Sequence, residues 1–432
     1  MRNRKIRVLI ITSMPWRDDN NIGNSYSNIF AGVKDKIEFA HIYCRSGMPQ
    51  NSICHRYFQI DESKLFLNIK NRKNILGKAF YLENPQNTDI EEFSPTYNRM
   101  RIMRWEIFFL ARNILWSLAD WKNKQLDNFV EEFEPDVMFG TLTYMPNINQ
   151  MMIYISRKYN LPLFIYSWDD VYSLKQFSLS PIYWIRRFSQ RKWIRKSVKQ
   201  ADKLYAITEL MQKEYSKYFE KPFELLYKGY SYQKEVFIPK KIHDPIKFVF
   251  MGNLGAGRWK TLAKMAKELD RINRNKRKVL LNIYTLSPLS KKMKDKLCIG
   301  NTSRIMPVVP NDMVMKVLQG ADILVHIEPL SLKNRLFYRL SFSTKLVDYF
   351  KAGKCIIGFG KNTASLKYIE DNQCGIVINH PSELKKKLVT LIDNSKIITE
   401  YSKRAWLCGF KNHQIEPIQE KLISDFLSVM RV

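Results

Sequence analysis

The chain has 432 residues, and at a usual domain size of about 150 residues this is too long for one hydrophobic core. Its 71 Lys and Arg residues against 41 Asp and Glu residues give a formal charge of +30, which favours a nucleic acid, an anionic membrane face or a phosphorylated ligand as partner. With 45% hydrophobic residues, the composition excludes a disordered basic tail.

Cysteine spacing and hydropathy indicate the cellular setting. The six cysteines are scattered without a CxxC pair, so neither a disulfide framework nor a zinc site is indicated and a reducing cytoplasm fits best. The apolar run 8–11 after the basic start is too short for a signal peptide and predicts a buried strand. No segment approaches the roughly 18 apolar residues of a membrane span, so we expect a soluble or peripheral protein.

The first half of the chain alternates predicted strands with predicted helices, beginning with a βαβ unit. A loop is predicted near 84–96, and a long aromatic-rich helix from 100 to 133. Predicted strands cover residues 7–12, 37–43, 137–140, 161–166 and 203–208, and the first predicted helix covers 24–33.

The second half repeats this alternation after a break at 239–245, so we place the domain boundary at residue 240. Its predicted strands cover residues 246–251, 279–285, 304–309, 322–327, 355–359 and 375–378. The pattern predicts two Rossmann-like, doubly wound α/β domains that face a cleft, with ligands at the carboxyl ends of the strands. They are an N-terminal domain, 1–240, and a C-terminal domain, 241–414, and we expect a last helix at about 415–432 to pack back on the first domain.

The segment 341–360 predicts a polar helix start, an amphipathic helix and a buried strand. Ser343 or Thr344 is expected to cap the helix, and Lys345 adds a charge beside the free N–H groups of the first turn. Asp348, one turn later, is placed to accept hydrogen bonds from hydroxyl groups. The pairing suggests the diphosphate and ribose of a nucleotide, and the alternative is an ordinary capped helix with a solvated Lys and Asp.

A glycine-rich turn, residues 252–257, lies between the predicted strand 246–251 and a predicted helix. Its backbone can approach a phosphate without interference from Cβ atoms, and Arg258 and Lys260 follow at once. The order G-x-x-G-x-G is not the dinucleotide fingerprint. A tight turn with exposed cations is therefore an equal alternative.

Two polar segments follow predicted strands of the first half. In the loop 16–24, Gly23 permits close approach by a ligand or by the opposite domain, and a plain solvated loop is the alternative. After the strand 161–166, Asp169 and Asp170 stand beside a tryptophan. They suit a general base whose pKa is raised by its neighbour, or equally a helix N-cap.

The stretch 181–199 interleaves aromatic residues with cations and contains no acid. Such a helix suits an anionic bilayer, with its cations at the lipid phosphates. Nucleic acid binding and a core-packed helix with a basic outer face are the alternatives. The cations assigned to lipid phosphates are Arg186, Arg187, Arg191, Lys192, Arg195 and Lys196.

Together these landmarks resemble a GT-B glycosyltransferase of the broad family 4 type, which is found in bacterial capsule, exopolysaccharide and lipopolysaccharide pathways. The resemblance covers most of the chain and is clearest at 250–254, 319–326 and 343–354. The last of these matches the family stretch S-x-K-x-x-E-Y-x-A-x-G-K, with Asp348 as the acid that holds the ribose. One departure is Leu340, where many members carry the first glutamate of a Glu-x7-Glu pair.

The resemblance implies a role for each site residue. The implied catalytic residues are Asp169, Arg258 and Lys345. The implied donor-binding residues are Gly252, Asn253, Lys260, Tyr284, Val309, Ser343, Thr344 and Asp348, and the implied acceptor-binding residues are Gly23, Asn24 and Asp170. No cofactor and no metal ion is expected, because cationic side chains and a helix start can stabilise a departing diphosphate.

The implied activity is transfer of a sugar from a nucleotide-sugar donor to a saccharide or lipid-linked saccharide acceptor in surface polysaccharide synthesis. We expect a cytoplasmic enzyme, peripheral at the inner face of the cell membrane through residues 181–199, with no nucleic acid partner. Two alternatives remain open. One is a sugar-nucleotide epimerase or hydrolase of the same fold, and the other is a non-catalytic basic protein that binds nucleic acid or membrane.

Overall fold

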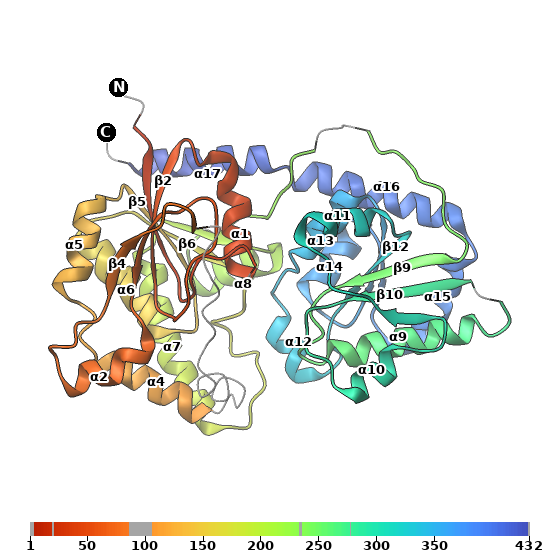
Figure 1. Cartoon of the computed structure of the whole chain (residues 1–432), viewed down its shortest axis with the longest axis horizontal. Coiled ribbons are helices and arrows are strands. Elements are labelled where there is room, and N and C mark those ends of the chain that lie inside the picture. The colour runs from red at the N-terminus through yellow and green to blue at the C-terminus, as the bar shows by residue number, and fades with distance from the viewer. Residues whose placement is uncertain (1–3, 20, 86–105, 233–235, 277, 431–432) are drawn as a thin grey trace. The chain divides into compact units, whose positions relative to one another are not determined.

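The computed structural model describes residues 4–19, 21–85, 106–232, 236–276 and 278–430 (Figure 1). The chain forms two compact units. Unit 1 comprises Met1–Leu174, Ser178–Lys228 and Ile415–Val432, and unit 2 comprises Lys175–Phe177 and Gly229–Gln414. The main change of unit falls after Lys228, ahead of residue 240, because the following residues bond within unit 2: the Tyr230 N–H donates to the His413 carbonyl at 2.8 Å.

Unit 1 is built on an eight-stranded sheet in the order β4-β3-β2-β1-β5-β6-β7-β8. All neighbouring strands pair parallel except β4, which lies antiparallel to β3 at one edge. The strands are β1 (Ile6–Ile11), β2 (Ile37–Tyr43), β3 (Arg56–Gln59), β4 (Lys78–Tyr81), β5 (Val137–Thr141), β6 (Leu163–Ser167), β7 (Lys203–Ala206) and β8 (Glu224–Leu225). The sequence did not predict β3, β4 or β8, because they have four residues or fewer and little apolar alternation.

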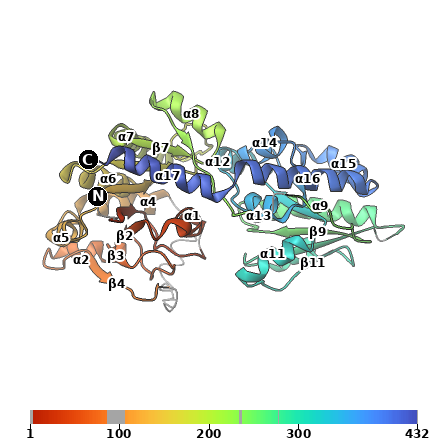
Figure 2. The ribbon, with the colours of Figure 1, turned by 90° about the horizontal axis from the view of Figure 1, so that it is seen from above.

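Helices cover both faces of this sheet (Figure 2). They are α1 (Asn21–Phe30), α2 (Leu65–Lys70), α4 (Glu106–Leu118), α5 (Lys124–Phe133), α6 (Pro146–Lys158), α7 (Pro181–Gln200), α8 (Glu209–Phe219) and α17 (Ile415–Val429). Short 3₁₀ turns occur at η1 (Ala31–Val33) and η2 (Glu62–Lys64). The C-terminal helix α17 belongs to unit 1, where the Phe426 ring lies 5.0 Å from that of Phe164 in β6.

The prediction of a single helix from 100 to 133 is wrong. Within the described residues, α4 ends at Leu118 and α5 begins at Lys124. The side chain of Asn123 accepts a hydrogen bond from the Leu126 N–H at 3.1 Å, so it caps a new helix and separates the two. Residues 100–105 and most of the predicted loop near 84–96 lie outside the described residues.

Unit 2 is built on a six-stranded, fully parallel sheet in the order β11-β10-β9-β12-β13-β14. Its strands are β9 (Ile246–Met251), β10 (Val279–Tyr284), β11 (Ser303–Ile305), β12 (Ile323–Ile327), β13 (Cys355–Phe359) and β14 (Ile376–Ile378). Its helices are α9 (Arg258–Ile272), α10 (Lys291–Leu297), α11 (Asn311–Gln319), α12 (Leu332–Tyr338), α13 (Lys345–Ala352), α14 (Ala364–Asp371), α15 (Leu384–Ile392) and α16 (Ser395–Asn412), with a 3₁₀ turn η4 (Pro381–Glu383).

The central strands of both sheets are buried runs rather than alternating ones. All five residues of β5, β6, β12 and β13 are buried, as expected for parallel strands with helices on both faces. The prediction of two doubly wound α/β domains is confirmed. Within the described part of the chain, no helix is long and apolar enough to cross a membrane.

Candidate functional site

The carboxyl ends of β9, β12 and β13 lie at one edge of the unit 2 sheet, because these neighbouring strands are parallel. Helix α13 is held against this part of the sheet by Tyr349. Its hydroxyl group donates to the Val325 carbonyl at 3.2 Å and accepts from the Met251 N–H at 3.4 Å. The glycine-rich turn after β9 and the start of α13 therefore belong to the same edge of unit 2.

The glycine-rich turn 252–257 is folded by its own hydrogen bonds. The Gly252 N–H donates to the Tyr284 carbonyl at 3.0 Å, and the Asn253 side chain accepts from the Gly255 N–H at 2.6 Å. Gly257 has a φ of +82° at the N-cap of α9, a left-handed conformation that glycine adopts without strain. Asn334 of α12 donates to the Ala256 carbonyl at 2.6 Å, so this turn is fixed before any ligand binds.

Arg258, the first residue of α9, is held by two groups at this edge. One guanidinium nitrogen, Nη2, lies 3.2 Å from a carboxylate oxygen of Glu328, and the guanidinium lies 4.4 Å from the ring centre of Tyr338. The Glu328 side chain is only 4% exposed, and its other oxygen lies 3.1 Å from His326 Nε2. A buried carboxylate thus orients the arginine that the sequence predicted as an anion contact.

Glu328 was not predicted as a site residue, although it directly follows the predicted strand 322–327. An acid at the carboxyl end of a buried parallel strand was the available indication. The backbone leaves room for this carboxylate at Gly360, where an added Cβ would lie 2.5 Å from the Glu328 Cβ. Gly360 is therefore required for close packing at this edge.

The start of α13 differs from the prediction. Thr344 occupies the N-cap position, but its side chain makes no capping hydrogen bond. The Leu346 N–H donates to the Ser343 carbonyl at 2.9 Å, and the Ser343 N–H donates to the Ser365 hydroxyl group at 2.9 Å. The N–H groups of Ser343 and Leu346 are therefore already hydrogen-bonded within the protein. The exposed Lys345 is the main candidate for contact with an anion here.

Asp348 lies on α13, but the chain itself already supplies a hydroxyl group to it. Tyr230 donates a hydrogen bond to Asp348 Oδ1 at 2.6 Å. Burial, followed by the charge of Asp348, raises the pKa of Tyr230, so the phenol stays protonated. The sequence predicted only the hydroxyl groups of a ligand as partners of Asp348, and Tyr230 was not predicted.

The remaining donor-binding candidates are spread along the same sheet. Tyr284 ends β10, and Val309 lies between β11 and α11, so both follow neighbouring strands. Burial raises the pKa of the half-buried Tyr284. Lys260 is exposed, and it is two positions from Arg258 on α9. Residues two apart do not face each other on a helix, so these two cations are not brought together by their spacing.

A separate pocket of about 190 Å³ lies at the carboxyl ends of the β1, β5 and β6 strands in unit 1. Asp169 lines it with its exposed side chain, beside Trp168. The other polar lining residues are Thr12, Ser13, Arg45, Thr141, Thr143 and Tyr144. This combination of hydroxyl groups, one carboxylate, one guanidinium and an aromatic face suits a polyhydroxylated ligand.

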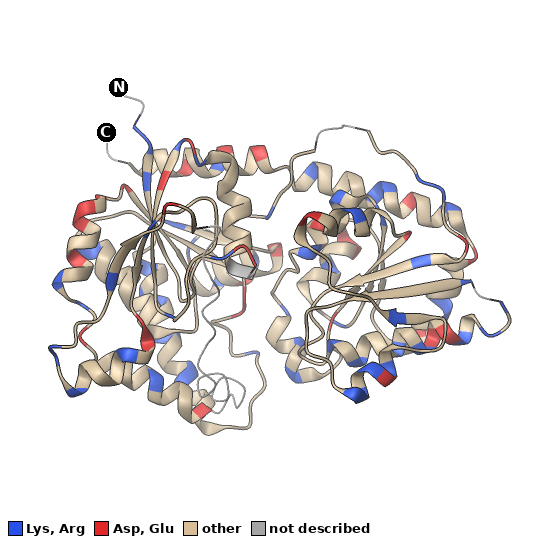
Figure 3. Cartoon of the chain, in the orientation of Figure 1, with Lys and Arg blue, Asp and Glu red and all other residues tan. Residues whose placement is uncertain are grey.

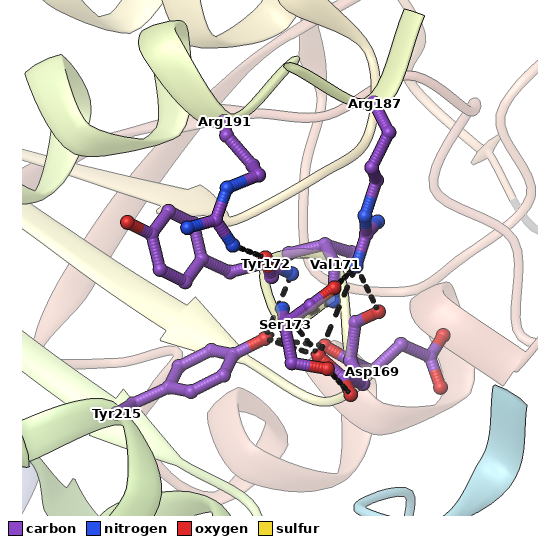
Figure 4. A network of polar contacts seen from close by, with 8 residues as sticks. Asp169, Val171, Tyr172, Ser173, Arg187, Arg191 and Tyr215 are labelled. Atoms are coloured by element: carbon purple, nitrogen blue, oxygen red, sulfur yellow. Dashed lines mark hydrogen bonds and ion pairs between the residues drawn. The ribbon is translucent and has the colours of Figure 1, made fainter. Parts of the chain in front are cut away.

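Asp170 is buried in unit 1, at a turn whose polar contacts with Arg187 and Tyr215 are drawn in Figure 4. Its carboxylate accepts hydrogen bonds from the N–H of Ser173 at 2.9 Å and from the Ser173 hydroxyl group, and Arg187 lies 4.0 Å from Oδ1. Tyr215 donates to the Asp169 carbonyl at 3.3 Å. The expectation that Asp170 binds a ligand is therefore wrong, because it is buried and holds the turn that presents Asp169.

Gly23 and Asn24 lie inside α1 rather than in a loop. A Cβ on Gly23 would lie 2.1 Å from the Arg17 carbonyl oxygen, so the close approach that needs glycine is made by the protein's own backbone. Asn24 donates to the Asp18 carbonyl at 3.3 Å. The prediction that Gly23 admits a ligand is therefore wrong.

The basic stretch 181–199 forms α7, but several of its cations act inside unit 1. Arg186 forms an ion pair with Glu106 at 2.7 Å, and Arg187 is buried, donating to the Ser173 carbonyl at 2.7 Å. Arg191 lies over the Tyr172 ring, 3.9 Å from its centre. Burial lowers the pKa of Arg187. The expectation that Arg186 and Arg187 meet lipid phosphates is wrong, because both are buried.

Comparison with known proteins identifies the fold. No family model matches the chain, and no curated protein matches it. Among solved structures, Anabaena HepE in complex with UDP-glucose is similar over 98% of this chain and 100% of its own, with 11% identity and a TM-score of 0.58. A glycosyltransferase from Rickettsia africae is similar over 99% of both chains, with 10% identity and a TM-score of 0.60.

The trehalose-6-phosphate synthase OtsA is also similar, over 98% of this chain and 99% of its own, with 9% identity and a TM-score of 0.59. These similarities span both units. The chain has the GT-B fold. In the part of this GT-B chain that the structure describes, no group of three or more His, Cys, Asp or Glu side chains is placed to hold a metal ion.

Proposed function

We propose that the protein is a glycosyltransferase that moves a sugar from a nucleotide-sugar donor to a hydroxyl group of an acceptor. The main supporting observation is one edge of unit 2, where the glycine-rich turn, the oriented guanidinium of Arg258 and the exposed residue Lys345 follow strands of one parallel sheet. The GT-B fold supports the proposal, since the similar HepE structure contains UDP-glucose.

Arg258 and Lys345 would bind the diphosphate of the donor. As the bond between the sugar and the diphosphate breaks, negative charge grows on the departing oxygen, and cations already in place stabilise it. Arg258 is oriented before binding by Glu328 and Tyr338. The glycine-rich turn would add close contact through the backbone of Gly252 and Asn253.

The nucleoside would lie along the neighbouring strand ends. Tyr284 and Val309 follow β10 and β11 and would contact the base. Asp348, whose Oδ1 accepts from Tyr230, would contact the ribose. Ser343 and Thr344 would contact the diphosphate from the helix start, and Lys260 would contribute only long-range charge.

In unit 1, Asp169 would accept a hydrogen bond from the acceptor hydroxyl group that becomes glycosylated. The new bond joins that hydroxyl oxygen to the anomeric carbon as the bond from this carbon to the diphosphate breaks, and the Asp169 carboxylate takes up the hydroxyl proton. We further propose that the acceptor is a saccharide or lipid-linked saccharide and that the reaction serves surface polysaccharide synthesis. The hydroxyl-rich pocket supports the acceptor class.

A panel of UDP, GDP, CMP and dTDP compounds tests the donor site by thermal shift. One nucleotide class should raise the melting temperature, because a ligand at 100 times its dissociation constant stabilises a protein by about 2.7 kcal/mol. Labelled sugar nucleotides of that class then test transfer with and without saccharide acceptors. The proposal fails if no nucleotide binds, and release of free sugar without transfer to any acceptor would favour a hydrolase.

The variant Lys345→Ala tests the predicted diphosphate contact. We expect transfer to fall by about 100-fold or more, while the melting temperature stays near that of the unmodified protein because Lys345 is exposed. Lys403→Ala, at an exposed lysine of α16, is the matched control and should leave transfer unchanged. Equal transfer by both variants would show that Lys345 does not contact the donor.

A further inference from the structure

Three helices of unit 1 leave large apolar side chains in solvent, and these side chains have no role in the proposed transfer reaction. On α7, the side chains of Ile185 and Phe188 are 62% and 57% exposed. Lys192 and Lys196, which are also exposed, lie further along the same side of this helix. The buried residues Gln190 and Ile194 occupy the opposite face.

Helix α4 carries a similar stripe. Ile107, Ile114 and Leu118 are each about half exposed, at 49%, 49% and 53%. Their spacing of seven and four positions places them on one face of the helix. Trp116, which is buried, lies on the other face.

The third helix with exposed apolar side chains is α2, where Phe66 is 63% exposed and Leu67 is 53% exposed. Helix α4 contacts both α2 and α7, and Figure 1 draws the three together at the lower end of unit 1. Arg72, just after α2, donates to the Leu118 carbonyl at 2.8 Å. We define the α2–α4–α7 face by Phe66, Leu67, Ile107, Ile114, Leu118, Ile185 and Phe188.

Most of the charges around this face are positive (Figure 3), although Asp61 and Glu62 precede α2 and the exposed Asp120 follows α4. Residues 63–82, which contain α2, have five Lys or Arg and no Asp or Glu, and residues 171–201, which contain α7, have eight and none. Helix α4 adds Glu106, but Arg186 neutralises it. The buried arginines of α7 do not contribute to the surface, so its outward cations are the lysines and Arg195.

Exposed apolar clusters mark interaction surfaces, because water is expelled when they are covered. A nucleic acid would use the cations, but it offers no apolar phase for isoleucine and leucine side chains. An anionic bilayer satisfies both features, since apolar side chains enter the headgroup boundary and lysines meet lipid phosphates. We propose that the α2–α4–α7 face binds an anionic membrane surface, and this inference does not depend on the proposed transfer activity.

Sedimentation of the full chain with lipid vesicles tests this proposal. The unmodified protein should pellet with phosphatidylglycerol-containing vesicles, less with phosphatidylcholine alone, and less at high salt. The triple variant Ile114→Glu, Ile185→Glu and Phe188→Glu should lose at least tenfold in vesicle affinity. Leu427→Glu, at a residue of α17 that is 54% exposed, is the matched control and should bind as the unmodified protein does.

A second variant, Lys192→Ala with Lys196→Ala, separates the charge contribution from the apolar one. Near an anionic surface each lysine contributes about 1 kcal/mol, so we expect vesicle affinity to fall by about tenfold or more, with a weaker salt dependence. Circular dichroism and melting temperatures check the fold of all variants. The proposal is overturned if the unmodified protein does not bind anionic vesicles or if the triple variant binds them equally well.

Light scattering completes the test, because a second copy of the chain is the competing occupant. A monomer that binds vesicles supports the membrane proposal. A dimer that the triple variant converts to monomer would overturn it and assign the α2–α4–α7 face to self-association.

Discussion

Asp169 and Asp170 are adjacent in the sequence and opposite in environment. Asp169 is exposed in the unit 1 pocket, whereas Asp170 is 3% exposed and faces Arg187 and Ser173. Removing one partner of a buried ion pair typically costs about 3 to 5 kcal/mol, because the other charge stays buried without compensation. Asp169 is therefore the carboxylate placed for the proposed ligand contact, and Asp170 makes structural contacts.

This division predicts different effects for the same substitution. Asp170→Asn should lower the free energy of unfolding by about 3 kcal/mol, and Asp169→Asn should change it by less than about 0.5 kcal/mol. Only Asp169→Asn should impair transfer in a fully folded enzyme. Urea unfolding and a transfer assay on both variants check this, and equal stability of the two would contradict the structural role of Asp170.

His41 is a buried histidine that unit 1 keeps neutral. Thr12 donates to the Met14 carbonyl, so its hydroxyl oxygen accepts from His41 Nε2 at 2.8 Å. His41 Nδ1 has no hydrogen-bond partner among the described residues. Burial lowers the pKa of His41 from 6.5 to about 3, because the surroundings do not solvate a charged imidazole.

A pH dependence of stability follows. Between pH 6.5 and about 3 the unfolded chain binds a proton at His41 that the folded protein does not. Protonation therefore favours the unfolded chain, so the free energy of unfolding is highest above pH 6.5 and decreases as the pH falls. Because of His41, the free energy of unfolding of the unmodified protein should fall by about 2 kcal/mol from pH 7 to pH 5. His41→Gln should reduce that loss, as measured by urea unfolding at both pH values. An unchanged pH dependence would show that other groups cause it.

At the scale of elements, α17 shows how a distant part of the sequence completes a core. The Phe426 side chain is fully buried, with its ring near Phe164 and Phe139 of the unit 1 sheet. Gln419 donates to the Ile29 carbonyl at 2.9 Å in α1. The helix therefore belongs to the folding unit of the first strands although it ends the chain.

The neighbouring positions 426 and 427 give a matched test of this packing. Phe426→Ala should lower the free energy of unfolding by about 3 to 5 kcal/mol, because a large buried ring leaves a cavity. Leu427→Ala, at a side chain that is 54% exposed, should cost less than about 0.5 kcal/mol. Chemical denaturation of both variants measures the difference, and similar values would mean that α17 is not part of the core.

At the scale of the whole molecule, the two units carry different parts of the proposed chemistry. Unit 2 holds the cationic edge with Arg258 and Lys345, and unit 1 holds the hydroxyl-lined pocket with Asp169. Each site lies at the carboxyl ends of parallel strands, where the loops of a doubly wound sheet converge.

Hydrogen exchange with a bound nucleotide should distinguish the two units. Protection should increase in residues 252–260 and 343–348 of unit 2, because a diphosphate would order the glycine-rich turn and the start of α13. Residues 141–144 and 168–171 of unit 1 should change little with nucleotide alone. Protection confined to unit 1 would assign the nucleotide to the other pocket and reverse the proposed roles.

The sequence by itself determined the fold class and the main strands of both units. The run 355–359 coincides with β13, and the run 246–251, apolar except for Lys247, coincides with β9, because a parallel strand buried on both faces is apolar along most of its length. The alternation of such runs with amphipathic helices leaves few topologies other than two doubly wound sheets. The turn before Arg258 was also located from local sequence, because glycine marks left-handed backbone.

Only the tertiary structure decided which polar side chains face solvent and which serve the interior. The spacing of Asp169 and Asp170, or of the arginines in α7, carries no information about burial. Glu328 beside Arg258 and Tyr230 beside Asp348 join residues 70 and 118 positions apart. Such contacts depend on how strands and helices pack, so no local pattern predicts them.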